Sequence, residues 1–365
     1  PLNYLLIQLN ILIMYLDIED IDTITVDFTA HCNAMCGNCS RNLGGVEVNP
    51  RMPLEHMSPA TFKNLFSENV LRNINQIVFN GSYGDPLVSP HLFECLDYLK
   101  NYKKPIIHIH TNGGMRQPKY FDELANKLKD FPFPTHVVFS IDGLEDTNHL
   151  YRRNVKWNKV MENAQAFLDA GGLGRWRMLV FEHNAHQLEQ AEELSKKMGF
   201  AKFDINGGHT FTAMNSMVNK AIEKFKANKR EQARTIKYDT SKLDNLKRLK
   251  DLKQKHGSLA DGFKKSCITC KWQKKRKIQV SHVGEVFPCC YMLSDRYPRE
   301  VESPYAQEVS KVDWLNVNDM PLEVILDSPF FAQDLPESWS SENRFKICEV
   351  TCGDCLLYTS PSPRD

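Results

Sequence analysis

The stretch Thr23–Ser40, TITVDFTAHCNAMCGNCS, carries the pattern that decides the fold. Its first part, residues 23–29, alternates between polar and apolar side chains, which is typical of a strand with one buried face. The strand runs directly into a loop that holds Cys32, Cys36 and Cys39. The sequence therefore predicts a buried strand with three thiols just beyond its carboxyl end.

The spacing of these thiols indicates a metal cluster with one open position. Three residues and then two separate the cysteines, so one short loop can wrap three corners of a cluster. Thiolates are the soft ligands that iron–sulfur clusters use. A closed zinc site needs four ligands. Although His31 adjoins the loop, no fourth cysteine or histidine lies near enough in sequence to complete such a site locally.

Downstream of the loop, strand patterns alternate with helix patterns. The expected strands are 76–80, 106–110, 136–141, 175–181 and 202–206, and the expected helices are 58–73, 90–102, 118–129, 157–170 and 184–198. The last helix is the best marked, with Asn184 as its N-cap, Gln187 three residues on and Gly199 at its end. Six strand–helix alternations predict an α/β fold with a parallel sheet curled into a barrel or part of one.

Unusual turns follow the strands at the edge where such sheets carry their functional groups. The turns are Gly81–Pro86 after the second strand, Thr111–Gly114 after the third and Ser140–Gly143 at the end of the fourth. A glycine-rich turn alone is weak evidence, because many loops need glycine. Their coincidence with the three thiols at one rim is stronger evidence for a ligand site.

The cysteine spacing after a first strand resembles the signature of the radical S-adenosylmethionine (radical SAM) superfamily. That family's partial (β/α)6 TIM-like barrel would match Thr23 to about Gly208. The resemblance implies that Cys32, Cys36 and Cys39 hold a [4Fe–4S] cluster whose open iron binds the amino and carboxylate groups of SAM. It also implies that one electron cleaves SAM to methionine and a 5′-deoxyadenosyl radical, which takes a hydrogen atom from the substrate.

The same resemblance implies a set of contacts to SAM. Gly84-Asp85-Pro86 resembles the family turn whose backbone oxygens receive the SAM ammonium, with Asp where Glu is usual. Ser140 and either Arg152 or Arg153 resemble positions that bind the SAM carboxylate, although an arginine pair at a helix start is also a common solvated feature. Asn112 either faces the ribose or makes its turn. No catalytic residue is assigned.

A second cysteine group follows a change in composition. Residues 14–215 are expected to form the barrel domain, and residues 216–265, dense in Lys and Arg, are expected to form a basic helical linker or, less favoured, a docking face for an acidic partner. In the third segment, 266–355, strand-like residues 278–280 and 286–289 predict a hairpin that brings Cys270 and Cys289 together.

This third segment resembles a SPASM or twitch extension, which implies an auxiliary [4Fe–4S] cluster. The candidate ligands are Cys267, Cys270, Cys289, Cys348, Cys352 and Cys355. The favoured set is Cys270 and Cys289 with Cys348 and Cys352, or with Cys352 and Cys355 if the chain is native at that point. Four thiolates on a hairpin also suit a zinc knuckle. Cys95 and Cys290 are expected to be buried small hydrophobes.

Both ends of the chain are expected to be non-native. Residues 1–13 are apolar without a basic leader or a cleavage site, which favours translated upstream sequence with Met14 as the start. Residues 356–365 continue a stretch, Cys355–Asp365, that resembles one reading frame of a transposon adapter.

Composition restricts the partners and the compartment. The 365 residues carry a formal net charge of +1, which gives no reason to expect nucleic acid or membrane binding. Eleven cysteines in tight clusters favour metal ligation in a reducing, cytoplasmic compartment. The resemblance implies a radical SAM enzyme acting on a peptide, protein side chain or small molecule, with a flavodoxin- or ferredoxin-like one-electron donor. The alternative is a non-catalytic iron–sulfur or zinc protein that keeps the fold.

Overall fold

The structure is a computed structural model that describes residues 15–102, 105–207, 254, 257, 267–299, 303–340 and 344–353. The predicted linker, apart from two single positions, lies outside the described residues, as do both terminal segments and Cys355. The chain divides into two compact units, which are described separately. Of the described residues, the first unit contains 15–25, 60–75, 254, 257 and those from 267 to 353, and the second contains 26–59 and those from 76 to 207.

The second unit is built on parallel strands. Its strand order is β1-β4-β5-β6-β7-β8, and the pairs from β4 to β8 are parallel. The bounds are β1 Thr23–Asp27, which begins in the first unit, β4 Gln76–Asn80, β5 Ile106–Thr111, β6 His136–Ser140, β7 Leu173–Val180 and β8 Lys202–Gly207. This parallel arrangement agrees with the predicted partial barrel.

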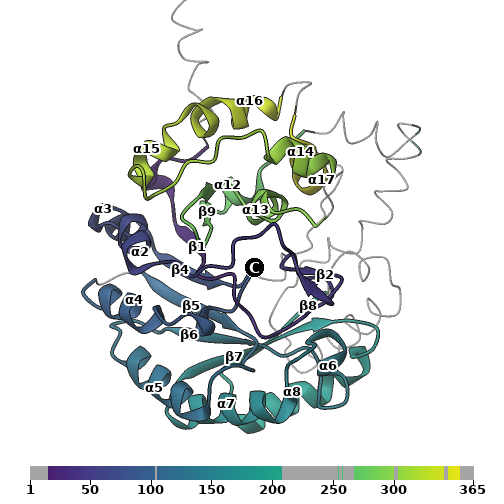
Figure 1. The fold of residues 1–365 in the computed structure, drawn as a ribbon. Coiled ribbons are helices and arrows are strands. Elements are labelled where there is room, and N and C mark those ends of the chain that lie inside the picture. Colours follow the sequence, from purple (N-terminus) through teal and green to yellow (C-terminus); the bar gives the residue numbers. More distant parts are fainter. Residues whose placement is uncertain are drawn as a thin grey trace, which may run out of the picture. The chain divides into compact units, whose positions relative to one another are not determined.

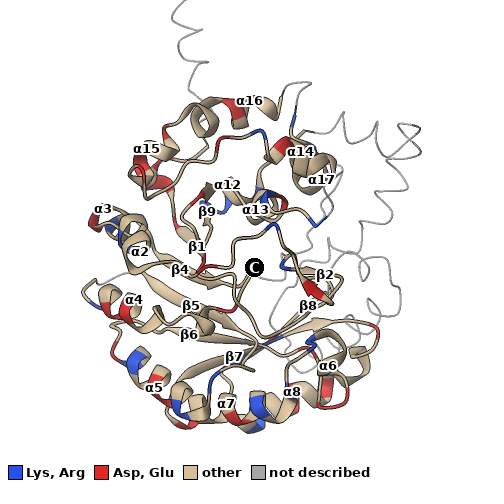
Figure 2. Ribbon diagram, viewed as in Figure 1, with Lys and Arg blue, Asp and Glu red and all other residues tan. Residues whose placement is uncertain are grey.

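Helices cover one face of this sheet, as Figure 1 shows for α4, α5, α7 and α8. Their bounds are α4 Leu92–Leu99, α5 Pro118–Lys129, α7 Trp157–Asp169 and α8 Leu188–Met198. Each has an apolar stripe turned to the sheet; in α5 it contains Phe121, Leu124 and Leu128, all buried. Figure 2 shows Lys, Arg, Asp and Glu interspersed along the outer sides of these helices. Because each helix returns the chain to the same edge, all strands end at one rim.

Aromatic side chains fill the layer between the sheet and the helices. Phe139 of β6 lies 5.8 Å from Phe121 of α5 and 5.7 Å from both Phe167 and Phe200, measured between ring centroids. All four rings are buried. This packing fixes the end of β6, which carries the Ser140 turn.

Shorter elements complete the second unit. They are β2 Asn42–Leu43, which pairs antiparallel with β3 Glu47–Val48, the 3-10 turns η2 Pro86–Val88 and η3 Ala185–Gln187, and α6 Asn148–Tyr151. The helix expected over 184–198 is therefore η3 followed by α8. Gly199 ends it in the left-handed region, with φ +94°, as expected.

The capping prediction for that helix is wrong. The Asn184 side chain makes no cap; it accepts from Phe181 N and donates to the carbonyls of Asp142 and Leu179. Gln187 instead bonds to the loop after β6, at Leu144 N and at Asp146. Both side chains join β7 and its following turn to the loop after β6, and these tertiary hydrogen bonds replace the local ones.

The first unit contains a hairpin and short helices. β9 Lys277–Val280 lies beside β1 and pairs antiparallel with β10 Val286–Phe287, in the register Val280 to Val286, which confirms the predicted hairpin. The other elements are η1 Ile18–Asp20, α2 Pro59–Leu65, α3 Glu68–Asn73, α12 Lys271–Lys274, α13 Cys290–Arg296, α14 Pro304–Val309, α15 Leu322–Leu326, the π-helix η5 Phe330–Asp334, α16 Leu335–Ser338 and α17 Lys346–Cys352.

The helix expected over 58–73 is two helices. Ser67 interrupts it and becomes the N-cap of α3, where its Oγ accepts from Val70 N at 3.3 Å. Among the described helices, none combines the length and hydrophobicity that a transmembrane segment requires.

Candidate functional site

The three thiols of the loop after β1 each meet a different neighbour at the rim of the second unit. Cys32 Sγ accepts from Ala34 N at 3.3 Å and from Asn112 Nδ2 at 3.5 Å. Cys36 Sγ lies 3.8 Å from Arg152 Nη1, which donates to it. Cys39 Sγ donates to the carbonyl of Ser82 at 3.7 Å. The turns after β4 and β5, and Arg152 just after α6, thus contact the cysteine loop.

Two arginines hold this loop through backbone carbonyls and the Asn42 side chain. Arg41 is buried, and its Nε donates to Ala30 O at 2.8 Å while its Nη1 donates to Asn42 Oδ1 at 3.1 Å. Arg153 Nη1 donates to the carbonyls of Gly44 and Gly45 at 3.3 and 3.4 Å. The sequence analysis missed Arg41, because an arginine two residues after a cysteine gives no signal of burial.

The turn after β4 approaches the start of the cysteine loop closely. Asp85 N donates to His31 O at 2.9 Å. A Cβ added to Gly84 would lie 2.7 Å from His31 O and closer still to Thr29 O, so only glycine fits here without a shift. The Gly84 turn is therefore held directly against the thiol loop.

The Asp85 carboxylate is buried and joins two rim turns. It accepts from Leu87 N at 3.1 Å, Thr111 Oγ1 at 2.9 Å and Asn112 N at 2.7 Å. Burial raises the pKa of Asp85, although these donors lower it in part. All three of these donors belong to the protein, which gives the Asp85 side chain a role in shaping the turn.

Asn112 makes its own turn and also reaches the first thiol. Its Oδ1 accepts from Gly114 N at 2.8 Å, while its Nδ2 donates to Asn33 Oδ1 at 2.9 Å and to Cys32 Sγ. The turn-forming alternative raised from the sequence is thus what the hydrogen bonds show. The contact with Cys32 also places an N–H donor beside that thiol, and the sequence did not predict this donor.

Arg152 is paired with a buried carboxylate that the sequence analysis named only as part of a turn. Its Nε donates to Asp142 Oδ2 at 2.6 Å, and the Asp142 side chain is fully buried. Asp142 Oδ1 in turn accepts from Leu179 N of β7 at 2.6 Å. Burial lowers the pKa of Arg152, but Asp142 and Cys36 outweigh that effect, so the guanidinium stays charged beside the Cys36 sulfur.

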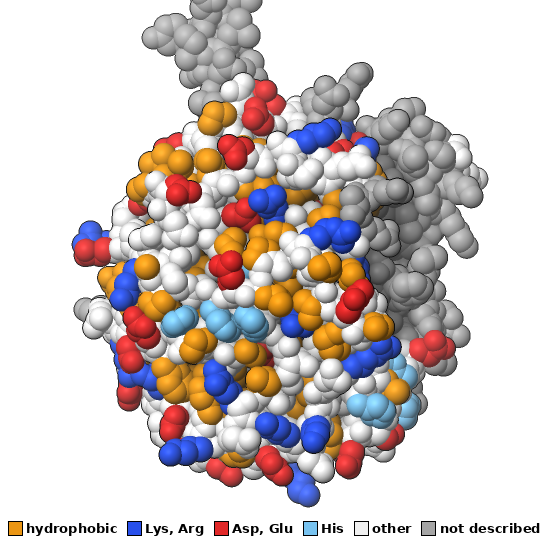
Figure 3. Space-filling model, in the orientation of Figure 1, with side chains coloured by type: hydrophobic (Ala, Val, Ile, Leu, Met, Phe, Trp, Pro, Cys, Tyr) orange, Lys and Arg blue, Asp and Glu red, His pale blue; other side chains and the backbone are white. Residues whose placement is uncertain are grey.

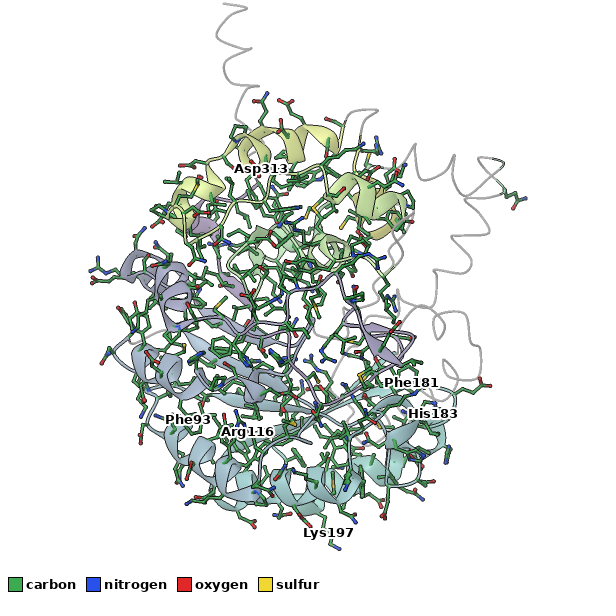
Figure 4. All side chains as sticks on the ribbon, in the orientation of Figure 1. Phe93, Arg116, Phe181, His183, Lys197 and Asp313 are labelled. Atoms are coloured by element: carbon green, nitrogen blue, oxygen red, sulfur yellow. The ribbon has the colours of Figure 1, made fainter. Side chains whose placement is uncertain are left out.

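Aromatic rings extend from this ion pair. Arg152 lies over the Tyr151 ring at 5.3 Å, and Tyr151 lies 4.5 Å from Phe181. Figure 4 labels Phe181 and His183, which lie side by side and stack at 5.3 Å. Histidines also gather on the face shown in Figure 3; near the thiol loop, His31 stacks on His56 at 4.4 Å.

Ser140 and two asparagine atoms are left for a polar ligand. Ser140 ends β6 and is half-buried. Asn80 Oδ1 at the end of β4 and Asn206 Nδ2 near the end of β8 are buried and have no hydrogen-bond partner among the described residues. Buried polar atoms normally have partners, so these atoms fit a polar molecule bound at this rim.

The thiols are also suited to a cluster rather than to free thiolates. Burial raises the pKa of Cys32, with a further contribution from Asp85, and burial raises the pKa of Cys36 to about 11 despite Arg152. Among the described residues, no three His, Cys, Asp or Glu side chains are close enough to hold one metal ion. A [4Fe–4S] cluster is larger than an ion, and its irons would compensate the charge of the buried thiolates.

Four further cysteines gather in the first unit. Cys348 and Cys352 lie one turn apart on α17, Cys289 is the N-cap of α13, and Cys270 is the N-cap of α12. Thr269 N donates to Cys352 O at 3.1 Å, which ties the Cys270 segment to α17. The Cys270 thiol donates to Cys352 and lowers the pKa of Cys352 to about 6, while Cys352, together with burial, raises the pKa of Cys270.

The same thiols also affect one another across α13 and α17. Burial and then the neighbouring thiols, Cys348 among them, raise the pKa of Cys289. Cys267 is exposed, whereas Cys95 and Cys290 are buried, as expected for small hydrophobes. Four mutually interacting thiols, three on buried residues and Cys289 on a half-buried one, fit an auxiliary cluster.

Comparison with protein families agrees with both sites. Residues 26–194 match the model of the radical SAM superfamily, and residues 270–356 match the SPASM model, an iron–sulfur cluster-binding domain. These domains imply a [4Fe–4S] cluster with SAM in the first and auxiliary iron–sulfur ligation in the second. No curated protein matches the chain.

Solved structures share the fold at low identity. SuiB from Streptococcus suis, bound to SAM, has a TM-score of 0.56 at 11% identity, covering 91% of this chain and 78% of that one. SuiB bound to the precursor peptide SuiA has a TM-score of 0.56 at 13% identity, covering 91% and 76%. AnSMEcpe with bound SAM has a TM-score of 0.54 at 18% identity, covering 91% and 89%. With both domain models, the fold and the cysteine loop in agreement, the chain belongs to the radical SAM superfamily and carries a C-terminal SPASM-type iron–sulfur domain.

Proposed function

We propose that this protein is an enzyme that cleaves SAM reductively and abstracts a hydrogen atom from its substrate. The observation that carries the proposal is the loop after β1, where Cys32, Cys36 and Cys39 meet the turns of β4 and β5 and the Arg152 guanidinium. When bound, the [4Fe–4S] cluster and SAM together supply the one-electron chemistry of the reaction. The protein positions these groups and keeps the site around the thiols largely buried.

The rim residues divide into two roles. The ion pair with Asp142 holds the Arg152 guanidinium beside Cys36. Its remaining N–H groups therefore suit a carboxylate such as that of SAM. The backbone of Gly84 and the Ser140 hydroxyl are the other proposed SAM contacts. Asp85, Asn112 and Arg153 hold the turns and the loop, because their side chains already bond to protein groups.

For the auxiliary cluster we propose ligation by Cys270, Cys289, Cys348 and Cys352. These thiols act on one another, and Cys270, Cys348 and Cys352 are buried while Cys289 is half-buried, which supports this set. Cys267 is exposed, so we leave it out. The cluster would ligate substrate or take an electron from it, and a flavodoxin- or ferredoxin-like donor would supply the electron for SAM cleavage.

The proposed substrate is a peptide or protein side chain. The support is structural likeness to SuiB, solved with the precursor peptide SuiA, and to anSMEcpe, solved with the Cp18Cys peptide. A small-molecule substrate remains the second choice. Free cysteines throughout the described residues and the two iron–sulfur sites suit a reducing cytoplasm.

The test is production of 5′-deoxyadenosine. The anaerobically reconstituted protein should form this nucleoside from SAM and dithionite, and Cys36→Ala should abolish it. Cys95→Ala is the matched control, because Cys95 is a buried thiol of the same unit in α4. A fully clustered protein that forms no nucleoside would instead support the non-catalytic alternative.

A further inference from the structure

The turn after β5 runs into Arg116, an arginine in a backbone conformation that arginine rarely adopts. Its φ is +63°, in the left-handed region, where glycine and asparagine are the usual residues. The turn ends there, because Gln117 is the N-cap of α5. A long side chain is therefore kept at a position that favours a short one, which indicates that the side chain itself has a use.

The Arg116 guanidinium holds the end of the turn after β4. Its Nε donates to Leu87 O at 2.8 Å, and its Nη2 donates to Val88 O at 2.9 Å and to Ser89 O at 3.3 Å. These carbonyls belong to the last two residues of η2 and to its C-cap. Because a guanidinium presents its N–H groups in a fixed fork, it fixes the three carbonyls relative to one another.

Asp85 and Arg116 hold the two ends of η2 against the same neighbouring turn. At the start of η2, the Asp85 carboxylate accepts from Leu87 N and from two donors of the turn after β5. At the end of η2, Arg116 reaches back from just beyond that turn. Asp85 N also donates to His31 O at 2.9 Å, so both turns are fixed to the start of the thiol loop.

An aromatic pair packs against the guanidinium. Arg116 lies over the Tyr120 ring at 5.0 Å, and Tyr120 stacks on Phe93 of α4 at 4.8 Å, with 11° between the ring planes. Figure 4 labels Phe93 and Arg116, which lie on the same side of the second unit. A second cation, Lys127 of α5, lies over the Phe93 ring at 5.4 Å and pairs with Asp97. Of the two cations on this aromatic pair, Arg116 is the one bonded to the η2 carbonyls.

We infer that Arg116 is a positioning residue for SAM, because it holds the Gly84 turn in the shape that receives the SAM ammonium. This rests on the proposed function, in which the Gly84 backbone contacts SAM. Arg116 acts through the η2 carbonyls and not by contact with SAM. Without the guanidinium, part of the binding free energy of SAM is spent on ordering the turn. The affinity for SAM then falls, whereas the bound complex reacts as before.

The experiment replaces Arg116 by Asn, which suits a left-handed backbone but is too short to reach the three carbonyls. In the anaerobically reconstituted full chain, Arg116→Asn should raise the KM for SAM by about tenfold, as expected when hydrogen bonds from a charged donor are lost. The kcat for 5′-deoxyadenosine and the iron content should not change. The matched control is Lys127→Ala, which removes the other cation of the aromatic pair and should leave the KM for SAM unchanged. Arg116→Gly, which also suits this backbone, should behave like Arg116→Asn.

Equilibrium binding tests the same role without turnover. S-adenosyl-L-homocysteine and its deamino analogue are titrated calorimetrically into the reconstituted protein. Arg116→Asn should weaken the binding of S-adenosylhomocysteine by about tenfold and leave the binding of the deamino analogue unchanged, because only the first ligand carries the group that the Gly84 turn receives.

Three results would overturn the inference. They are an unchanged KM for SAM in Arg116→Asn, an equal loss of affinity for both ligands, and loss of iron, because a residue that only positions SAM is not needed for cluster assembly. Failure of the proposed function shows separately, as absence of 5′-deoxyadenosine from the fully clustered unmodified protein.

Discussion

Gly84 shows how a single backbone position governs the site in the second unit. Its Cα faces the carbonyls of Thr29 and His31, at the point where β1 passes into the cysteine loop. We expect Gly84→Ala to push this loop away, to destabilise the protein by about 1–3 kcal/mol as other overpacked sites do, and to lose most of the first cluster. Iron analysis after anaerobic reconstitution should show about four irons fewer per chain, the content of one [4Fe–4S] cluster.

The loop supplies its own control for this change. A Cβ on Gly37 would meet only Gly44 O, at 3.8 Å, which is an ordinary contact. Gly37→Ala, although it lies between two of the thiols, should therefore keep the iron content and the stability of the unmodified protein. Equal iron loss in both variants would show that the loop tolerates no added side chain at all, and the argument from the Gly84 contacts would fail.

At the residue scale, the sequence revealed the thiols but not the side chains that orient them. Cys32, Cys36 and Cys39 have a spacing that one loop needs, so a local pattern was enough. Asp142 acts through Arg152, ten residues away, and through Leu179 of the next strand. Arg116 bonds to Leu87 O across 29 positions of sequence. Such pairings depend on tertiary packing and leave no local pattern to recognise.

At the scale of the element, periodicity located most strands and several helices. The strand 76–80 and the helix 118–129 have the predicted bounds, because the burial pattern and the end signals agree there. The predicted helix bounds and caps were wrong where a polar side chain could hydrogen-bond to either of two partners. Ser67 caps a new helix within 58–73, and Asn184 bonds to β7 and the loop after β6 rather than to its own helix. Local rules cannot tell which partner such a residue will choose.

The helix α13 carries a half-buried acid, Asp295, whose raised pKa is expected to make the stability of the first unit depend on pH. Burial raises the pKa of Asp295 to about 6, Glu308 of α14 raises it further and Arg299 opposes this. The folded protein thus holds this proton more tightly than the unfolded chain does. Below about pH 4 the Asp295 carboxyl is protonated in both the folded and the unfolded chain, and its contribution to stability is full. This contribution is lost as the pH rises to about 6. The loss amounts to about 3 kcal/mol at neutral pH.

Replacing this acid should remove the penalty. Asp295→Asn stays neutral, so it should be more stable than the unmodified protein at pH 7, and the advantage should shrink towards pH 5. Thermal unfolding at several pH values measures the difference. Asp130→Asn is a control of opposite sign, because Lys100 lowers the pKa of Asp130 and its stabilising ion pair is present at neutral pH. An Asp295→Asn advantage that does not change with pH would contradict the titration argument.

At the scale of the whole molecule, the two sets of thiols belong to different compact units. Cys32, Cys36 and Cys39 are held by rim turns of the second unit, and Cys289 lies with Cys270, Cys348 and Cys352 in the first. Loss of one auxiliary ligand should therefore leave the chemistry of the first cluster in place. Cys289→Ala should lose about four irons per chain and still form 5′-deoxyadenosine from SAM.

The neighbouring thiol makes this prediction specific. Cys290 is buried next to Cys289 but is expected only to fill space, so Cys290→Ala should keep its iron and cost about 1 kcal/mol in stability at most. Iron content, nucleoside release and modified substrate, measured together, distinguish the outcomes. Cys289→Ala should release nucleoside without modifying substrate, because the electron or substrate contact of the auxiliary cluster is gone. If Cys289→Ala abolished nucleoside release while retaining the first cluster, the two sites would not act as separate centres, and the auxiliary cluster would be needed for SAM cleavage itself.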